Sequence, residues 1–272
     1  MNGSLQKTAI VTGASTGIGR ASAEALAGAG YRVFGTSRRP TGDDPRGVTM
    51  LACDVTDEQS VQTLVADILA RTGQIDLLVN NAGMGLVGAA EESSIAQVRS
   101  LFDVNVFGVM RVTNAVLPSM RQRRRGRIIN ISSILGLIPT PYGAHYGATK
   151  YAIEGYSESL DHELRAFNIH VSLIEPGYTR SVFEQNALEP DVPIAVYDHA
   201  RAGARALIRD MMVTAADDPE VVAQAVLVAA RAAEPRLRYT AGKQARMTSL
   251  LRRFVPASAF DKSLRKQMRL PA

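Results

Sequence analysis

Short apolar runs alternate with longer segments of helical periodicity through most of the chain. Runs that predict β-strands lie at residues 7–12, 31–37, 48–54, 75–80, 126–132, 169–176 and 237–242. Most are rich in Val, Ile and Leu without clean alternation, as expected of strands covered on both faces of a parallel sheet. Helices are predicted at residues 18–29, 58–72, 94–123, 146–167 and 217–233. The pattern predicts an α/β fold, a doubly wound parallel sheet of about seven strands with helices on both faces.

No repeat, linker-like composition or low-complexity segment divides the 272 residues, so we expect a single domain over residues 1–272. The last predicted helix has a clear start, with Asp218 as its N-cap and Pro219 as its first residue. The irregular stretch at 182–216 is interpreted as an insertion over a functional site rather than a domain boundary.

Residues 244–272 are predicted to form a helical tail. Phe260, Leu264 and Met268 recur there at four-residue spacing beside basic side chains, which indicates a short basic amphipathic helix. Docking of this helix on the body or on a neighbouring subunit is favoured over contact with a membrane surface.

The formal net charge of +5 comes largely from residues 121–127 and from the tail. The arginines at 121–127 stand where the long helix is predicted to end, a position that favours cations, so a solvated helix end is preferred to a nucleic-acid surface.

The first strand begins at Lys7 and no apolar run approaches the ~20 residues of a membrane span, so we expect a cytoplasmic protein without a signal peptide. Cys53 is the sole cysteine and is expected to be buried. The histidines show no zinc-ligand spacing, and no metal is expected.

The segment "TGASTGIGRA" follows the first predicted strand and opens the first helix. Its glycines have the spacing G-x3-G-x-G, which lets backbone approach a pyrophosphate while the helix N-terminus presents free N–H groups. The sequence therefore predicts a nucleotide site in a Rossmann-type fold. The expected contacts are Gly13, Ser15, Thr16, Gly17, Ile18 and Gly19.

Ser37 ends the second predicted strand and Arg38 and Arg39 follow it, without the acidic residue that usually binds the ribose of NAD there. Arginine side chains suit a 2′-phosphate, so NADP(H) is predicted in preference to NAD(H). Asp43 and Asp44 are the alternative ribose contacts, but they follow Pro40 in a loop.

Two further segments complete the predicted nucleotide site. Asp54 and Val55 follow the third strand and are expected beside the adenine, although a loop cap is an alternative role for Asp54. "NNAG" ends the fourth strand, where small residues admit the cofactor and the amides can tie adjacent strands together; its cofactor contacts would be Asn81, Ala82 and Gly83.

A phenol and an ammonium group are predicted to meet on one helix face. Tyr146 and Lys150 are i,i+4 neighbours in a run without proline, whereas Tyr142 lies among prolines and glycines that favour a turn. Ser132 and Ser133 end the strand before them. This arrangement indicates a candidate site for acid–base chemistry.

In this order, "TGASTGIG", "CDV", "NNAG", "DVNVFG", "ISS", "YGATK" and "EPG" resemble the short-chain dehydrogenase/reductase family over about residues 5–182. The resemblance implies a catalytic tetrad of Asn105, Ser133, Tyr146 and Lys150, and it implies that Tyr146 and Lys150 also contact the cofactor. Tyr146 would be the acid or base, with its pKa lowered by Lys150 and by the oxidised nicotinamide, and Ser133 would donate to the substrate oxygen. Asn105 would hold a water that relays protons to Lys150.

The same resemblance implies that the loop after the sixth strand clasps the nicotinamide carboxamide. The residues concerned are Pro176, Gly177, Thr179 and Ser181. It also implies a homodimer or homotetramer built on the long helices near 94–123 and 146–167.

The predicted substrate walls are mostly apolar and comprise "MGLVGAA", "ILGLIPTPYGA", Phe183, Leu188, Ile194 and Tyr197, with Tyr142, His145 and Tyr197 at the rim. "TSRRP" and "NNAGMGLVGAAEE" are similar to the subgroup of 17β-hydroxysteroid and retinol dehydrogenases. We therefore expect reversible hydride transfer between NADP(H) and a hydrophobic ketone, aldehyde or secondary alcohol. The alternatives are a regulatory protein that binds NADP with little turnover and, less favoured, a nucleic-acid-binding protein.

Overall fold

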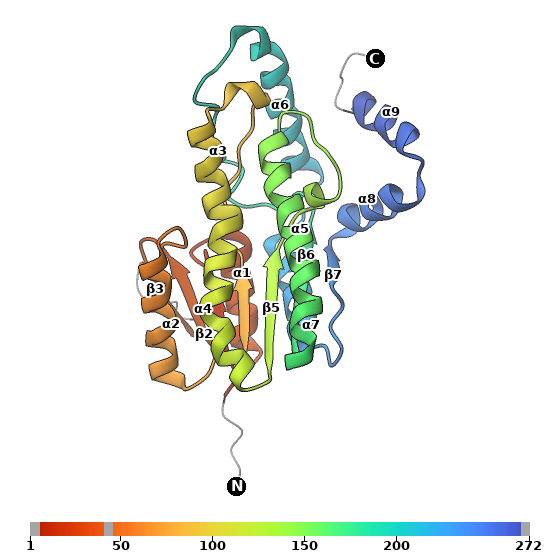
Figure 1. The fold of residues 1–272 in the computed structure, drawn as a ribbon. Helices are drawn as coiled ribbons and strands as arrows, with labels where there is room; N and C mark the ends of the chain where they lie inside the picture. The colour runs from red at the N-terminus through yellow and green to blue at the C-terminus, as the bar shows by residue number, and fades with distance from the viewer. Residues whose placement is uncertain (1–5, 41–45, 268–272) are drawn as a thin grey trace.

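The computed structural model describes residues 6–40 and 46–267 and shows one parallel sheet covered by helices (Figure 1). Its strands are β1 (Thr8–Val11), β2 (Arg32–Ser37), β3 (Val48–Ala52), β4 (Leu77–Asn80), β5 (Gly126–Ile131), β6 (Ile169–Pro176) and β7 (Arg238–Ala241). They lie in the order β3-β2-β1-β4-β5-β6-β7, and every neighbouring pair is parallel. The predicted doubly wound sheet is confirmed.

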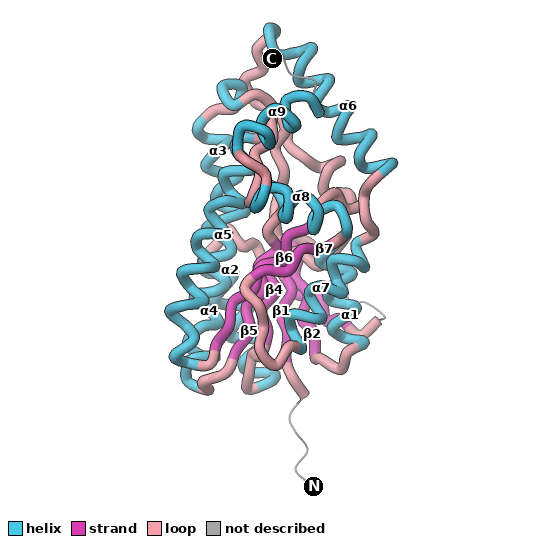
Figure 2. Tube along the Cα trace, turned by 90° about the vertical axis from the view of Figure 1, so that its right-hand side faces the viewer, coloured by secondary structure: helices cyan, strands magenta, loops and turns pink. Residues whose placement is uncertain are grey.

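Helices cover both faces of the sheet. They are α1 (Gly17–Gly28), α2 (Glu58–Thr72), α3 (Ile95–Phe102), α4 (Gly108–Gln122), α5 (Ala144–Leu164), α6 (Asp198–Thr214), α7 (Pro219–Arg231), α8 (Lys243–Phe254) and α9 (Ala257–Gln267). α1 and α7 pack on one face, and α2, α4 and α5 pack on the other. Beyond the carboxyl edge of the sheet lie α6, α8 and α9 (Figure 2).

Alternate residues of each strand enter opposite cores, because successive side chains of a strand point to opposite faces. In β1, Ala9 and Val11 pack with α1 and α7, whereas Ile10 packs with α2, α4 and α5. β5 repeats this with Ile129 on the first side and Ile128 on the second. All five side chains are at most 1% exposed, which explains why the strand sequences lack polar alternation.

Two predicted boundaries differ from the structure. The helix expected at 94–123 is interrupted by a π-helical turn, Asp103–Phe107, which separates α3 from α4. The stretch at 182–216, expected to be irregular, contains the 17-residue helix α6. Because this segment contains many charged residues, its sequence shows no clear apolar helical face, and the helix was not predicted.

Other local predictions are confirmed. α7 begins with Asp218 as N-cap and Pro219 as its first residue. α9 forms within the predicted tail, although Met268 lies outside the described residues. α4 ends within the arginine run, where Arg123 donates to Asp76 Oδ1 at 2.6 Å and Arg124 donates to the Ala166 carbonyl at 2.6 Å. These arginines therefore stabilise the fold at a helix end.

Within the described residues, no helix is long and apolar enough to cross a membrane. The same part of the chain contains no group of three or more His, Cys, Asp or Glu side chains that could hold a metal ion. Cys53 is buried, as expected.

Candidate active site

A cavity of about 910 Å³ opens at the carboxyl edge of the sheet. It lies where the chain order reverses between β1 and β4, the point at which open α/β sheets bind ligands. The predicted nucleotide contacts that line it are Gly13, Ser15, Thr16, Gly17, Ile18, Gly19, Ser37, Arg38, Asp54, Val55, Asn81, Ala82, Gly83, Tyr146, Lys150, Pro176, Gly177, Thr179 and Ser181. Arg39 is exposed and does not line the cavity, so the structure separates it from this set.

The turn after β1 depends on glycine at three positions. Gly13 and Gly17 have φ angles of +64° and +53°, in the left-handed region that favours glycine. A Cβ atom at Gly19 would lie 2.2 Å from the Gly13 carbonyl oxygen and 2.3 Å from Nδ2 of Asn81. The start of α1 therefore packs directly against this turn and the loop after β4.

The N-terminus of α1 has free donors at the cavity wall. Thr16 is the N-cap, with φ −150° and ψ 168°, but its side chain makes no capping hydrogen bond. The first N–H groups of a helix have no partner within the helix and attract anions. Because Gly17 and Ile18 also line the cavity, this wall suits a phosphate group.

The end of β2 has the polar groups that a 2′-phosphate requires. Oγ of Ser37 is buried without a hydrogen-bond partner among the described residues, an arrangement that costs free energy unless a ligand supplies one. Arg38 lines the cavity beside it, and a guanidinium matches phosphate geometry. Asp43 and Asp44, the alternative ribose contacts, lie outside the described residues. The residues present therefore fit a nicotinamide dinucleotide.

Asp54 caps its own loop and also lines the cavity. Its Oδ1 accepts hydrogen bonds from the backbone N–H of Thr56 at 2.9 Å and from the Thr56 hydroxyl at 2.7 Å. These hydrogen bonds lower the pKa of the Asp54 carboxyl. The loop-cap role is therefore present in the structure, and the carboxylate stays ionised next to Val55 at the cavity wall.

The two asparagines at the end of β4, Asn80 and Asn81, join neighbouring strands, as predicted. Nδ2 of Asn81 donates to the carbonyl oxygens of Thr12 at 2.9 Å and Gly13 at 3.0 Å. Nδ2 of Asn80 donates to Oδ1 of Asn130 at 2.9 Å, which links β4 to β5. These hydrogen bonds connect the end of β4, next to the cavity, to the loop after β1 and to β5.

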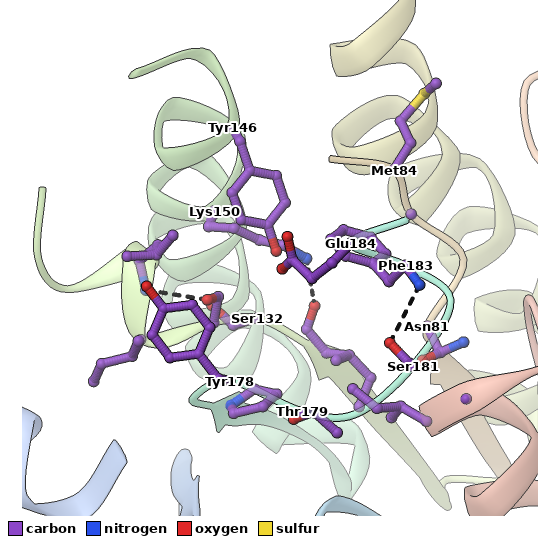
Figure 3. Close-up of a pocket in the computed structure, with 18 of the residues that line it drawn as sticks. Asn81, Met84, Ser132, Tyr146, Lys150, Tyr178, Thr179, Ser181, Phe183 and Glu184 are labelled. Atoms are coloured by element: carbon purple, nitrogen blue, oxygen red, sulfur yellow. Dashed lines mark hydrogen bonds between the residues drawn. The ribbon is translucent and has the colours of Figure 1, made fainter. Parts of the chain in front are cut away.

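Tyr146 and Lys150 lie one turn apart on α5 and face the cavity, as predicted (Figure 3). Nζ of Lys150 donates to the carbonyl oxygen of Ile131 at 2.9 Å and lies 5.6 Å from the centroid of the Tyr146 ring. Tyr142 occupies the turn before α5 with a φ of +62° and does not line the cavity. The helix geometry thus distinguishes the two tyrosines.

Burial governs the charges of this pair. It lowers the pKa of Lys150 to about 8, against an opposing effect of Glu154. Burial, followed by the carboxylate of Glu184, raises the pKa of Tyr146, while Ser133 opposes this shift. The predicted lowering of the Tyr146 pKa by Lys150 is therefore not found in the protein itself, because desolvation of the phenolate dominates. A phenol that keeps its proton can donate it to a carbonyl oxygen.

The structure distinguishes the two serines. Ser133 is half-buried, its Oγ accepts from the N–H of Leu135 at 3.1 Å, and its hydroxyl opposes the rise in the pKa of Tyr146. Ser132 is 3% exposed, and a Cβ atom on Gly136 would lie 3.0 Å from its Oγ. Both serines line the cavity, but Ser133 is the more accessible of the two and has the better position for contact with a ligand.

Asn105 lies on the π-helical turn and is 2% exposed. Its Oδ1 accepts from the N–H of Met84 at 2.9 Å, and its Nδ2 donates to the Met84 carbonyl at 2.9 Å and to Oγ1 of Thr149 at 3.2 Å. Asn105 does not line the cavity, and both amide hydrogens have protein partners. Its side chain links three segments of the site; π-helical turns of this kind are frequent at functional sites.

Only part of the predicted substrate wall lines the cavity. The residues that do are Met84, Ile134, Leu135, Ile138, Pro139, Thr140, Phe183 and Leu188. Among those that do not are Tyr142, His145, Ile194 and Tyr197. The Tyr197 hydroxyl hydrogen-bonds the carboxylate of Glu91, and Nε2 of His145 lies 2.9 Å from the carbonyl oxygen of Ala90. These two side chains stabilise the rim instead.

Sequence reasoning missed a wall made by three helices. It consists of Leu207 and Met211 of α6, Gln244, Thr248 and Leu251 of α8, and Val255, Phe260, Ser263 and Leu264 in and before α9. Within this tail, α8 contacts β7 and the turn Ile134–Gly136, α9 contacts α8, and both helices contribute side chains to the cavity. Tyr178 and Glu184, in the loop after β6, were also missed, since no motif marks them. The four-residue spacing of Leu207 and Met211 was an available signal.

A buried acidic cluster lies behind Lys150. Nε of Arg238 is 2.9 Å from Oε2 of Glu154 and 3.5 Å from Oε1 of Glu175. Burial raises the pKa of Glu154, and it raises the pKa of Glu175 to about 7, helped by the Glu154 charge and opposed by Arg238. Glu175 is 1% exposed. The cluster thus holds negative charge next to the buried ammonium of Lys150.

Comparison with known proteins agrees with this geometry. The family model for short chain dehydrogenases matches residues 7–192. A 3-ketodihydrosphingosine reductase from Bacteroides thetaiotaomicron is 45% identical over 177 residues, which cover 65% of this chain and 65% of that protein. Human retinol dehydrogenase 8 is 36% identical over 253 residues, or 85% of this chain and 80% of that protein. The crystal structure of a short-chain dehydrogenase from Streptomyces avermitilis is 35% identical, has a TM-score of 0.82 and covers 99% of this chain and 96% of its own.

The sheet topology and the cavity at its switch point define a nucleotide-binding α/β oxidoreductase. The chain belongs to the short-chain dehydrogenase family, whose members act on alcohol and carbonyl groups with a nicotinamide cofactor.

Proposed function

We propose that this protein is an NADP(H)-dependent oxidoreductase that interconverts a hydrophobic ketone or aldehyde and its alcohol. The observation that carries the proposal is the position of Tyr146 and Lys150, in one cavity between the glycine-rich turn and the apolar walls. A substrate carbonyl at the phenol of Tyr146 would thus lie beside the nucleotide.

In the proposed mechanism, Tyr146 donates its proton to the carbonyl oxygen during reduction and takes it back during oxidation. The bound cofactor supplies or accepts the hydride. Ser133 donates a hydrogen bond to the same oxygen as negative charge develops on it. Lys150, buried and held by the Ile131 carbonyl, places its positive charge next to the phenol. Asn105 is a positioning residue, since it ties α5 to the loop after β4 through Thr149 and Met84.

The preference for NADP(H) rests on the end of β2. Arg38 lines the cavity next to the buried hydroxyl of Ser37, and these two groups suit a phosphate better than a ribose hydroxyl.

The hydrophobic substrate class rests on the walls that α6, α8 and α9 contribute. Leu207, Leu251, Phe260 and Leu264 are aliphatic or aromatic, and they line the same cavity as Tyr146. Such walls favour an apolar substrate body.

We also propose that two or four copies assemble through α4 and α5. Phe107, next to α4, and Tyr151 on α5 are 48% and 44% exposed, large apolar surfaces for a protein side chain. Light scattering coupled to size-exclusion chromatography measures the assembly, and a monomer at micromolar concentration contradicts it.

The test of the activity follows NADPH absorbance with long-chain ketones, retinals, steroid ketones, aryl ketones and short aldehydes. Tyr146→Phe should lower kcat by about 10²–10⁴-fold, because it removes the general acid, while NADPH binding by fluorescence titration stays unchanged. Tyr142→Phe is the matched control and should keep its turnover. Tight NADPH binding without turnover of any carbonyl would instead favour a regulatory protein.

A further inference from the structure

Helix α8 has two different sides. One side lines the cavity, through Gln244, Thr248 and Leu251. A second side carries Met247, Leu250 and Phe254, which do not line the cavity and are between 50% and 73% exposed. Their spacing of three and four residues places them in one stripe along the helix. α8 therefore presents a row of large apolar side chains to solvent, whereas exposed apolar side chains usually stand singly.

Basic side chains flank this apolar stripe. Arg246 and Arg253 lie together along one border of it, because each residue rotates an α-helix by about 100°. Both are exposed, and neither forms a salt bridge with the described part of the chain. The guanidinium of Arg253 lies 5.6 Å from the centroid of the exposed Phe254 ring. The positive charges thus stand next to the apolar stripe and are not neutralised by these neighbours.

The positive charge of the chain is concentrated in α8 and α9. Seven of its 31 Lys and Arg residues lie in these two helices, but only one of its 26 Asp and Glu residues, Asp261. The rest of the chain is therefore close to neutral. On α9, Lys262 and Lys266 are exposed. The two helices lie together at one side of the molecule, beyond β7 (Figure 1, Figure 2). This side is therefore strongly basic as well as apolar.

This combination of groups matches the surface of an anionic bilayer better than other partners. Apolar side chains of an interfacial helix enter the boundary between headgroups and acyl chains, while Lys and Arg interact with the lipid phosphates. A second copy of the chain, bound through the same face, would bring like charges together. A nucleic acid would pair with the arginines but would leave Met247 and Leu250 exposed.

The apolar stripe adjoins the cavity wall. Leu251 lines the cavity and is also 47% exposed, and it lies one helical turn from Phe254. In α9, Phe260 and Leu264 likewise line the cavity, while Lys262 and Lys266 are exposed. Both helices therefore have one side on the cavity and another in solvent.

We propose that the outer face of α8 and α9, formed by Met247, Leu250, Phe254 and the basic side chains beside them, binds the surface of a membrane that contains anionic phospholipids. The helices would lie in the plane of the interface, with the apolar stripe at the level of the upper acyl chains. α8 would keep its contacts with β7, so packing on the body and membrane contact, the two roles considered for the tail, are compatible. Binding of this kind requires no turnover and goes beyond the proposed oxidoreductase function.

Cosedimentation of the full chain with lipid vesicles tests the proposal. Vesicles of phosphatidylcholine and phosphatidylglycerol in a ratio of about 2:1 are compared with vesicles of phosphatidylcholine alone. The apparent Kd should be at least about tenfold lower for the anionic vesicles, and it should rise between about 0.05 M and 0.5 M salt, because salt screens the charges. Failure to bind either vesicle, or equal binding to both, overturns the proposal.

A first pair of variants tests the apolar stripe. Leu250→Ser/Phe254→Ser should raise the Kd for anionic vesicles by at least about tenfold, because two apolar side chains no longer enter the lipid. Ile95→Ser/Val196→Ser is the matched control, since it removes two side chains that are 68% and 80% exposed outside the tail, and it should bind as the wild type does. Titration with NADPH checks that each variant is folded.

A second pair tests the charges. Arg246→Gln/Arg253→Gln should raise the Kd for anionic vesicles by about 10–30-fold at low salt and should reduce its salt dependence. Arg99→Gln/Arg209→Gln removes two exposed arginines from α3 and α6 and should have little effect. Equal losses in the two arginine pairs would show that net charge alone causes binding, which overturns the assignment to α8 and α9.

Two further measurements identify other occupants of this face. If light scattering shows that Leu250→Ser/Phe254→Ser splits an oligomer of the wild type, the face is an interface between copies and the proposal is wrong. A lower Kd for a single-stranded oligonucleotide than for anionic vesicles would assign the face to nucleic acid instead. None of these measurements depends on carbonyl turnover, so their failure leaves the proposed oxidoreductase function intact.

Discussion

The cavity has two halves that are built in different ways. In the cofactor half, other residues pack closely against glycine backbone: added Cβ atoms at Gly13 and Gly17 would each lie 2.9 Å from an atom of another residue, and one at Gly19 still closer. In the substrate half, separate helices contribute single side chains, and Leu251 of α8 is 47% exposed. The match to the family model ends at residue 192, before α6. A substitution at one of these glycines should thus damage the scaffold, whereas one in the substrate half should change only selectivity.

The largest effect should come from Gly19→Ala. The new methyl group would overlap the Gly13 carbonyl and the Asn81 amide, so we expect the Kd for NADPH to rise by more than about 100-fold and the free energy of unfolding to fall by several kcal/mol. Fluorescence titration and urea denaturation measure the two. Gly28→Ala is the control, because nothing lies within 4 Å of its added Cβ, and it should raise stability by up to about 1 kcal/mol. Normal NADPH affinity in Gly19→Ala would show that the backbone contact is dispensable.

The next largest effect should be a pH dependence of stability that comes from Glu175, in the acidic cluster with Glu154 and Arg238. Glu175 has its pKa raised from 4.5 to about 7, so the native state keeps a proton that the unfolded state releases. Its contribution to stability is present below about pH 4.5 and is lost as pH rises through 7. Relative to Glu175→Gln, the wild type should lose up to about 3 kcal/mol of unfolding free energy across this window.

Urea denaturation at pH 5 and pH 8 measures this difference. Glu158→Gln is the control, because Glu158 pairs with the same Arg238 but has its pKa lowered rather than raised. At pH 8, Glu158→Gln should not show the higher unfolding free energy, relative to the wild type, that is expected of Glu175→Gln. Parallel pH profiles for Glu175→Gln and the wild type would show that Glu175 titrates normally.

A smaller effect is expected at the end of β2. Arg38→Ala should raise the Kd for NADPH by about 10–100-fold and leave the Kd for NADH nearly unchanged, because only NADPH presents a 2′-phosphate. Arg39→Ala is the matched control and should have little effect, since Arg39 does not line the cavity. Equal losses for both cofactors in Arg38→Ala would contradict phosphate recognition.

The smallest effect should come from the substrate half. The double variant Phe260→Ala/Leu264→Ala should raise KM for a long-chain ketone by about tenfold and leave KM for a short aldehyde unchanged, since only the longer substrate reaches α9. Steady-state kinetics with both substrates test this. Phe254→Ala is the control, because Phe254 is 73% exposed and does not line the cavity. A similar rise in KM for both substrates would indicate a general disturbance.

The same contrast explains what could be predicted from the sequence. The strands and the glycine-rich turn depend on local chemistry, buried aliphatic runs and left-handed glycines, which is visible residue by residue. The two tyrosines could be distinguished because proline and glycine exclude Tyr142 from the helix interior. The π-helical turn could not be predicted, since its residues resemble those of the adjoining helices and tertiary contacts of Asn105 accompany it.

The substrate half depends on how distant segments pack, which single-chain patterns do not encode. Glu184 stands in a loop without a motif, and only the folded chain brings it to Tyr146. The raised pKa of Tyr146 was missed for the same reason, because desolvation is a property of the assembled site.

Because of the π-helical turn between α3 and α4, deletion of a single residue in this segment should disturb the structure. The turn contains one residue more than an α-helical turn would need, and each residue rotates a helix by about 100°. Loss of the codon for Val106 or Phe107 would bring Asn105 one residue closer to Val112 and Val116, which pack on the sheet, and would change its rotation relative to them. The chain could then keep its core contacts or its Asn105 bridge, but not both. In an evolutionary lineage, therefore, the length of this segment should be retained more strictly than its individual side chains.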